Sequence, residues 1–397
     1  MRIVIAQRDL AQLGGSQTFV LTIAEHLARL GHNVTVYALE LGLAAELGRA
    51  RAIEIVGAAG LPDGAVEATI SLDSAMAIDM ARRYPSAVRL YAMHHSDEVW
   101  RPPAAPGIVA ATVAPNERLM TVARGCAGAG EVVRIKQPID LSRFTPRGCW
   151  PRETPRRILL IGNYFQTPAQ RVDQLRAAWS APGLKWRQIG HPHPSTAVAE
   201  AMAEADIVVG YGRSILEAMA CGRPAYVHEH SGSDGWVTAE SYARMEGDGF
   251  SGMAVRAPPS LDQLRKDFAL YAPALGHVGR DFSRGHDARL VAAELVALIN
   301  RLGKPENQHD PIALKALSAL AESRYRADLD ISALRYEVRT LRSKLRRRRT
   351  PRRIGRLFSR LGSRARAWFR SLRTRPGPRP RREVEQTSGG LEARRED

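Results

Sequence analysis

The chain has 397 residues, of which 44% are hydrophobic and 6% aromatic, as is ordinary for a globular protein of two or three domains. Its formal net charge is +17, but 18 of its 58 lysines and arginines lie between Arg342 and Arg382, where there is no Asp or Glu. The rest of the chain carries 40 basic and 41 acidic residues and is electrically neutral. The basic charge therefore belongs to a tail, and a main body that binds nucleic acid is not expected.

The three cysteines, Cys126, Cys149 and Cys221, lack metal-ligand spacing and make no disulfide framework, which favours a reducing compartment. The amino-terminal stretch MRIVIAQRDL holds an apolar run of only four residues and no cleavage site. No stretch of the chain approaches 18 apolar residues. We therefore expect a cytoplasmic protein without a secretory signal or a transmembrane helix.

The first 100 residues alternate short apolar runs with helical patterns. After the first run comes a Gly14-Gly15 loop, and apolar residues then recur at helical spacing until Gly31 ends the helix. The predicted strands of this part are residues 3–6, 33–38, 68–72 and 88–93. Strands that alternate with helices in this way predict a parallel sheet covered by helices.

A second set of strands follows a connection that is rich in proline and charge, KQPIDLSRFTPRGCWPRETP. The predicted strands of this set are residues 157–162, 186–190, 206–209 and 224–228. We therefore divide the main body into an amino-terminal Rossmann-like domain (1–140), a linker (141–156) and a second Rossmann-like domain (157–303).

The stretch GYGRSILEAMACG, residues 210–222, joins a predicted strand to a predicted helix. Its first glycines permit a sharp turn, and Ser214 with Glu217 matches a capping box. Free amides at such a helix start make an anion site suited to a diphosphate, and a purely structural turn is the alternative. The Gly14-Gly15 loop follows the same logic, so the two glycine loops are expected to face each other across a cleft.

Residues 311–346 carry a heptad pattern, in which seam positions step by four and three with one polar breach at Arg324. The seam comprises Ala313, Leu317, Leu320, Arg324, Ala327, Ile331, Leu334, Val338, Leu341 and Leu345. The pattern predicts a coiled coil that makes a homodimer through residues 313–345. The alternative is a helix that packs on its own domain.

Residues 347–382 predict a basic amphipathic helix with aromatic anchors. Its apolar face comprises Ile354, Leu357, Phe358, Leu361, Ala365, Trp368, Phe369 and Leu372, and arginines fill most of the rest. This composition is typical of a segment that lies in an anionic membrane surface, here residues 352–373. A nucleic-acid arm and packing of the stripe on the protein itself are the alternatives. Residues 383–397 are expected to be disordered.

Three stretches together resemble the family 4 retaining glycosyltransferases, which have the two-domain GT-B fold. The family's amino-terminal glycine loop and first helix are matched by LGGSQTFVLTIAEHLARLGHNVTVYA, and its interdomain signature by PIDLSRFTP. Its donor-binding segment is matched by ADIVVGYGRSILEAMACGRPAYV. The resemblance covers residues 1 to about 303. It implies an α/β protein with two Rossmann-like parallel-sheet domains that face a cleft, followed here by an α-helical carboxyl-terminal extension.

The resemblance implies roles for residues of the second domain. Glu217 is similar to the second glutamate of the family's E-x7-E motif, which accepts hydrogen bonds from the donor ribose; the capping-box partner of Ser214 is its structural alternative. Gly212, Arg213 and Ser214 would place backbone amides against the nucleotide phosphates. The side chain of Arg213 is expected to face solvent.

The resemblance also implies roles for residues of the first domain. Gly14 and Gly15 would let this domain approach the transferred sugar or the diphosphate. His94 or His95, at the end of a strand, lies where the family places a histidine near the transferred sugar and is the candidate catalytic residue. A satisfied core histidine is the competing interpretation.

The sequence departs from the family pattern at two places. Val209 stands where the first glutamate of E-x7-E is expected. After the strand RILLIG, Asn163 and Pro168 stand where an Arg and a Lys usually clamp the diphosphate, and Arg171 is the nearby cation. A catalytically degenerate nucleotide- or sugar-binding scaffold that organises partners through its coiled coil is therefore the alternative function.

The main prediction is a retaining hexosyltransferase-type enzyme that moves a sugar from a nucleotide diphosphate donor to a glycan or lipid-linked acceptor. The sequence shows no acidic pair for a metal at a strand end, so helix dipoles and cations are expected to meet the phosphate charge without a metal or other cofactor. The tail suggests an enzyme of cell-envelope polysaccharide biosynthesis that associates peripherally with the inner face of the membrane. A sugar-nucleotide epimerase is a further alternative, which the PIDLSRFTP signature does not favour.

Overall fold

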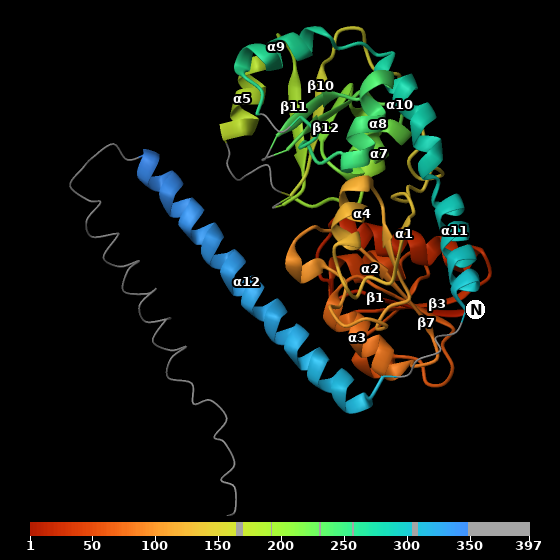
Figure 1. Cartoon of the computed structure of the whole chain (residues 1–397). Coiled ribbons are helices and arrows are strands. Elements are labelled where there is room, and N and C mark those ends of the chain that lie inside the picture. Colours follow the sequence, from red (N-terminus) through yellow and green to blue (C-terminus); the bar gives the residue numbers. More distant parts are fainter. Residues whose placement is uncertain (164–169, 192, 230–231, 256–257, 304–308, 348–397) are drawn as a thin grey trace, which may run out of the picture. The chain divides into compact units, whose positions relative to one another are not determined.

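The computed structural model describes residues 1–163, 170–191, 193–229, 232–255, 258–303 and 309–347 (Figure 1). The chain divides into two compact units, residues 1–327 and 328–397. The first unit contains both sheets. The basic segment 352–373, with the membrane interaction predicted for it, and the tail 383–397 fall outside the described residues.

The first sheet is wholly parallel and has the strand order β5-β3-β1-β6-β7-β8-β9. Its strands are β1 (Arg2–Ala6), β3 (Asn33–Tyr37), β5 (Glu54–Val56), β6 (Ala68–Ser71), β7 (Val88–Ala92), β8 (Ala111–Ala114) and β9 (Glu131–Arg134). A separate parallel pair joins β2 (Asp9–Leu10) to β4 (Glu40–Leu41). The four strands predicted for this domain are confirmed.

Helices cover both faces of this sheet, because alternate residues of each strand point to opposite sides. Ile3 and Ile5 of β1 pack with α1, whereas Val4 and Ala6 pack with α3. The helices of this domain are α1 (Gly15–Arg29), α2 (Leu43–Arg49), α3 (Ser74–Arg83) and α4 (Glu117–Arg124), with 3-10 turns η1 (Ala58–Gly60) and η2 (Glu98–Trp100).

The second sheet has the order β11-β10-β12-β13-β14, in which only β14 is antiparallel to its neighbour. Its strands are β10 (Arg157–Ile161), β11 (Lys185–Ile189), β12 (Ile207–Gly210), β13 (Ala225–His228) and β14 (Ser233–Trp236). Its helices are α5 (Gln170–Ala178), α6 (Val198–Glu204), α7 (Arg213–Ala220), α8 (Ala239–Asp248), α9 (Leu261–Ala269) and α10 (Leu275–Ser283), followed by η3 (Arg284–His286). The strands predicted from the sequence are confirmed here too.

The last helix that the sequence grouped with the second domain returns to the first. In α11 (Ala288–Leu302), Val291, Leu295 and Leu298 are buried in the core that α1 and β1 share (Figure 1). The second domain is therefore bounded at both ends by crossings of the chain, because residues 283–288 lead back to the first sheet.

The long helix α12 (Pro311–Arg347) contains the predicted heptad seam, and its first turns pack on the first domain. Leu314 is buried, and Leu317 and Ala321 pack against the same cluster, which includes Tyr91 and Val109. The alternative of a helix packed on its own domain is thus confirmed for these turns. A dimer seam that starts at Ala313 is therefore wrong for these turns, because Leu317 packs on the first domain of its own chain.

The two crossings between the domains lie side by side. Ile139 N donates to His286 O at 2.7 Å, and Ala288 N donates to Ile139 O at 2.9 Å, so a short parallel bridge joins Ile139 to Asp287. Asp287 also accepts from Arg289 N at 3.0 Å and so caps α11. We call the residues 138–144 and 284–288 the hinge.

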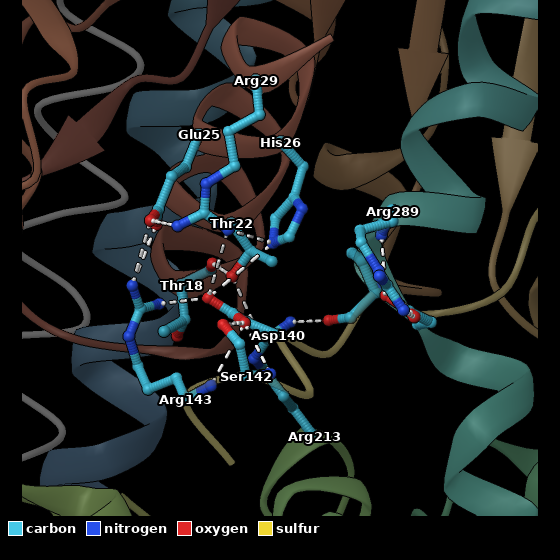
Figure 2. Close-up of polar contacts among 12 residues, drawn as sticks. Thr18, Thr22, Glu25, His26, Arg29, Asp140, Ser142, Arg143, Arg213 and Arg289 are labelled. Carbon is cyan, nitrogen blue, oxygen red and sulfur yellow. Dashed lines mark hydrogen bonds and ion pairs between the residues drawn. The ribbon is translucent and has the colours of Figure 1, made fainter. Parts of the chain in front are cut away.

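Asp140 anchors the hinge to α1 (Figure 2). Its Oδ1 accepts from Ser142 N at 3.0 Å, while its Oδ2 lies 3.3 Å from Arg143 Nη1 and 3.7 Å from His26 Nε2. Arg143 in turn donates to both carboxylate oxygens of Glu25, at 3.0 and 3.2 Å. Asp140 and Arg143 of the PIDLSRFTP stretch thus form an ionic clasp with His26 and Glu25 of the first helix of the first domain.

Burial by itself raises the pKa of Asp140, but His26, Ser142 and the charge of Arg143 outweigh it and hold this pKa well below its ordinary value. A carboxyl whose pKa is depressed on folding stabilises the folded state above its unfolded pKa, and this stabilisation fades as the pH falls. The clasp therefore contributes to stability at neutral pH and loses its contribution in acid.

Asp140→Asn should lower the free energy of unfolding at pH 7 by about 1–3 kcal/mol, because charge-assisted hydrogen bonds are lost. The difference in the free energy of unfolding between this variant and the wild type should become smaller once the pH falls below about 4, where the unfolded carboxyl becomes protonated. Urea denaturation at pH 7 and pH 3 measures both. Asp262→Asn is the matched control, because Asp262 pairs with Arg265 on the surface and should change little. Equal stability of Asp140→Asn and wild type at pH 7 would contradict this role.

Candidate functional site

A cavity of about 760 Å³ lies between the two domains, at the carboxyl ends of the strands of both sheets. Ligands of parallel α/β proteins bind outside the carboxyl ends of the strands. The wall includes Gly14, Gly15, Thr22, Arg51, His94, His95, Asn116, Arg118 and Arg143 on the side of the first domain and linker, and Gly162, Asn163, Gly190, Tyr211, Gly212, Arg213, Ser214, Glu217, Glu246 and His286 on the other. Both glycine loops therefore meet one cavity, as the sequence predicts.

The Gly14-Gly15 loop forms the start of α1. A Cβ at Gly15 would meet no protein atom within 4 Å, whereas one at Gly14 would lie 2.6 Å from Gln17 Oε1. The first turn of α1 contains no acidic residue, so the positive end of its dipole is not neutralised there. Asn163 of the second domain donates through Nδ2 to Leu13 O at 3.4 Å, which holds this loop against the end of β10.

The second glycine loop depends on a left-handed glycine. Gly212 has φ +59, which glycine adopts without strain, and α7 begins at the next residue. Gly212 N donates to Phe250 O at 2.8 Å, so this amide is already used. The amides of Arg213 and Ser214 have no hydrogen-bond partner among the described residues. Two of the three amides predicted to bind phosphate are thus available.

The predicted capping box of Ser214 and Glu217 is wrong. The helix cap is Gly212, with no side-chain cap bond, and Ser214 already lies inside the first turn. Ser214 Oγ donates to Tyr211 O at 2.8 Å and accepts from Tyr211 N at 3.3 Å, which fixes the turn before the helix. The predicted end of the helix at Gly222 is confirmed, because Gly222 follows the cap residue with φ +67.

Arg213 does not face solvent, contrary to the expectation from sequence. Its side chain is 7% exposed, and each of its three nitrogens has a partner. Nε donates to Glu217 Oε1 at 2.7 Å, Nη1 to Pro138 O at 2.6 Å and Nη2 to Thr22 Oγ1 at 2.9 Å. The side chain therefore ties α7 to the hinge and to α1, and only its backbone amide is left for a ligand.

Glu217 combines an internal contact with a place in the cavity wall. Its side chain is 8% exposed, and Oε1 is bound to Arg213. Burial raises the pKa of the Glu217 carboxyl, and the charges of Arg213, Arg143 and Arg51 oppose this rise. The bond to Arg213 holds the carboxylate in a fixed place, from which its second oxygen can accept a hydrogen bond from a ligand hydroxyl.

His94 follows β7 and lies in the wall of the cavity, in edge contact with Phe19 of α1 at 4.3 Å between ring centroids. Burial, with His95 and Arg213 nearby, lowers the pKa of His94 to about 3. The ring is therefore neutral at pH 7. Its Nε2 is buried without a hydrogen-bond partner among the described residues, which argues against the interpretation of a satisfied core histidine.

His95 and Arg171 differ from His94. His95 also lines the cavity but is exposed, with its ring 6.0 Å from that of Trp100. Arg171 is in the first turn of α5, and its side chain lies outside the described part of the structure, as does Pro168.

The two departures from the family pattern have structural roles. Val209 is fully buried in the core of the second domain, where an unpaired glutamate would be costly. Asn163 Oδ1 accepts from His191 N at 3.0 Å, and Asn163 N donates to Tyr211 OH at 3.2 Å. Asn163 thus joins three loops at the edge of the cavity.

Three arginines of the cavity wall escaped the sequence analysis as site residues: Arg51, Arg118 and Arg143. Arg51 Nη1 is buried without a partner among the described residues, and burial together with Arg143 lowers the pKa of Arg51. Arg118 pairs with Asp248 of the second domain at 3.2 Å. Arg143 lay within a quoted motif and Arg118 follows a strand, but nothing in the sequence marks Arg51.

Among the described residues, no group of three or more His, Cys, Asp or Glu side chains is placed to hold a metal ion. No helix in the same ranges has the length and apolar character needed to cross a membrane.

No protein-family model and no curated protein matches the chain. Solved structures do. Anabaena Alr3699/HepE, in complex with UDP and glucose, has a TM-score of 0.54 and 12% identity over 76% of this chain and 99% of that chain. WaaG, a glycosyltransferase involved in lipopolysaccharide biosynthesis, has a TM-score of 0.50 and 12% identity over 75% and 99%. The pneumococcal O-GlcNAc transferase GtfA, in complex with UDP and GlcNAc, has a TM-score of 0.50 and 8% identity over 76% and 99%.

At these identities the likeness concerns the fold. Two parallel-sheet Rossmann-like domains, a cavity at their facing edges and a helix that returns to the first domain are present in one compact unit. The chain has the α/β GT-B fold.

Proposed function

We propose that this chain is a retaining glycosyltransferase of the family 4 type, which moves a sugar from a nucleotide diphosphate donor to a glycan or lipid-linked acceptor. One observation carries the proposal: both glycine loops, Glu217 and His94, whose Nε2 has no hydrogen-bond partner among the described residues, line the same interdomain cavity. The coarse fold alone would not distinguish chemistries, because one fold hosts many functions.

The donor is proposed to lie against the second domain. Its diphosphate would accept hydrogen bonds from the amides of Arg213 and Ser214 at the start of α7, where the helix dipole favours negative charge. The ribose hydroxyls would donate to the free oxygen of Glu217. Gly15 presents no side chain on the opposite wall, which leaves room for the diphosphate and the transferred sugar.

Cations from the first domain and the linker would meet the charge of the departing nucleotide. Arg51 and Arg143 line the cavity, and Arg51 has a buried nitrogen to offer. Stabilisation of charge on the leaving group is usually the largest catalytic contribution. In this proposal these arginines and the α7 amides supply it without a metal ion, in place of the Arg and Lys that the family has after β10.

The reaction would proceed on one face of the sugar. The bond from the anomeric carbon to the diphosphate breaks, and the acceptor hydroxyl forms the new bond on the same face while its proton passes to the leaving phosphate oxygen. His94 is neutral at pH 7, so it would form a hydrogen bond with a sugar hydroxyl and would carry no charge. The complexes of HepE and GtfA contain UDP, so UDP-sugars are the first donors to test.

A catalytically degenerate scaffold is the second candidate, and Val209 favours it. In this chain position 209 belongs to the core, so the polar contact that a glutamate would make to sugar or acceptor has no counterpart there. A scaffold would bind nucleotide sugar without releasing nucleotide.

Two further proposals concern the carboxyl-terminal extension. Beyond the turns that pack on the first domain, Ile331, Leu334 and Val338 are exposed at spacings of three and four, which is the pattern of a dimer seam on α12. Residues 352–373 would hold the enzyme on an anionic membrane surface, near a lipid-linked or cell-envelope acceptor.

Glu217→Gln should weaken the binding of UDP and of the donor sugar by about tenfold or more, because hydrogen bonds to a charged group contribute about 1.5–3 kcal/mol. Glutamine still accepts from Arg213, whereas Glu217→Ala would leave a buried guanidinium unpaired at a cost of about 3–5 kcal/mol. Calorimetry on the full chain measures the affinity, with the exposed Glu204→Gln as control. Unchanged affinity in Glu217→Gln would remove the ribose role.

Incubation of the wild type with UDP-, GDP- and ADP-sugars, with excess chelator in a parallel arm, should release nucleotide from at least one donor in both arms. Donor binding without release in any acceptor mixture would favour the scaffold.

Ile331→Asp with Val338→Asp should convert a dimer into monomers, because unpaired charges would enter the apolar seam. Multi-angle light scattering on the full chain gives the mass. Ala333→Asp is the control, since it places an aspartate on the opposite side of the helix. A wild type that is already monomeric at micromolar concentration would contradict the proposed dimer seam.

Trp368→Ser with Phe369→Ser should greatly weaken sedimentation with anionic liposomes while every arginine stays, because burial of apolar side chains adds a component that salt does not screen. If the double variant binds like wild type and moderate salt abolishes binding, the tail acts only electrostatically.

A further inference from the structure

The first turns of α12 are built into the first domain by a buried polar cluster as well as by apolar packing. Arg8, which follows β1, is 4% exposed. Its Nη2 lies 2.8 Å from Glu322 Oε2 of α12 and 3.5 Å from Asp73 Oδ1, the residue that caps α3. A buried charge needs partners, and α12 supplies one of the two carboxylates.

Tyr325 of α12 contacts both this cluster and an aromatic residue of the cavity loop. The guanidinium carbon of Arg8 lies 4.0 Å from the centroid of the Tyr325 ring, within the range of a cation–π interaction. Tyr325 also makes an edge contact with Trp100, at 5.7 Å between ring centroids. One ring of α12 therefore contacts both Arg8 and Trp100.

The segment 94–101 connects these contacts to the cavity. It begins with His94 and His95, which line the cavity, and ends in the turn η2 that contains Trp100. Trp100 O accepts from Tyr91 OH at 2.7 Å, and Glu98 pairs with Arg324 of α12. The segment is thus held between β7 on one side and α12 on the other.

The helix α12 follows the part of the chain that resembles glycosyltransferases in sequence, which ends near residue 303. The likeness to HepE covers 76% of this chain and 99% of that chain. In the described part of this chain, α12, which begins at Pro311, contacts one end of the segment 94–101, and the other end of that segment lines the cavity.

We propose that Tyr325 and Glu322 of α12 are positioning residues, which hold the segment 94–101 so that His94 and His95 face the bound sugar or acceptor. The helical extension is then part of the site's architecture and not only an attachment device. The kinetic consequence rests on the proposed transferase function, but the positioning itself does not.

The test compares full-length Tyr325→Ala, Tyr325→Phe, Glu322→Gln and Leu320→Ala. Leu320 is 67% exposed on the same helix, so its variant is the matched control. Hydrogen–deuterium exchange is measured for peptides that cover residues 94–101, where Trp100 N donates to Asp97 O and Arg101 N to Glu98 O. Binding of UDP and steady-state transfer kinetics are measured on the same preparations.

Tyr325→Ala should accelerate exchange of the 94–101 amides by about tenfold or more relative to the rest of the first domain, since a locally opened segment exchanges independently of the global fold. Transfer should fall by about ten- to 100-fold in kcat, because displacement of reacting groups by about 1 Å has an effect of this order. UDP affinity should stay within about twofold, because the α7 amides and Glu217 are untouched. Glu322→Gln should give a smaller change in the same direction.

Tyr325→Phe should behave as wild type, because the ring and its two contacts remain, and so should Leu320→Ala. If exchange in 94–101 is unchanged in Tyr325→Ala, or if all peptides of the first domain accelerate equally, the positioning role is overturned and Tyr325 serves only stability. If exchange rises selectively but the wild type transfers no sugar, the proposed function fails while the positioning inference holds.

Discussion

The arrangement of this molecule depends on the hydrogen bonds and the ion pair that the buried guanidinium of Arg213 makes. It sits at the start of α7, the helix whose amides face the cavity, and its other nitrogens bind Thr22 of α1 and the carbonyl of Pro138 in the hinge. Glu217 neutralises it from the next turn of the same helix. A charge without water must have every donor satisfied, so the helix start, the hinge and the first domain are fixed together.

Local patterns predicted the local structure well. The strands of both sheets follow from apolar runs, and the left-handed conformations of Gly31, Gly212 and Gly222 follow from the turns around them. These features are decided by neighbours a few residues away, and glycine marks them in the sequence. The fold class followed from the alternation of strands and helices together with the family resemblance.

What the sequence did not predict are contacts between distant segments. Arg213 meets Thr22 across 191 residues, and no local pattern distinguishes it from a solvated arginine. The capping box failed because Gly212 is the cap and the helix begins at Arg213, so Ser214 lies inside the first turn and its side chain bonds to the preceding turn. A heptad pattern does not show which surface the apolar stripe packs against, and the first turns of α12 pack on the first domain of the same chain. Arg51 reaches the cavity through tertiary packing alone.

The hinge determines how the cavity can change shape. Both crossings of the chain meet at the bridge between Ile139 and Asp287, so one narrow place carries every covalent link between the domains. Rotation about it would need dihedral changes in only a few residues. Opening would break the hydrogen bond of Arg213 to Thr22, separate α4 from α8 and break the contact of Arg118 with Asp248, which is partly exposed to solvent. The ease of opening should therefore depend on ionic strength, because added salt screens an ion pair that is partly exposed to solvent.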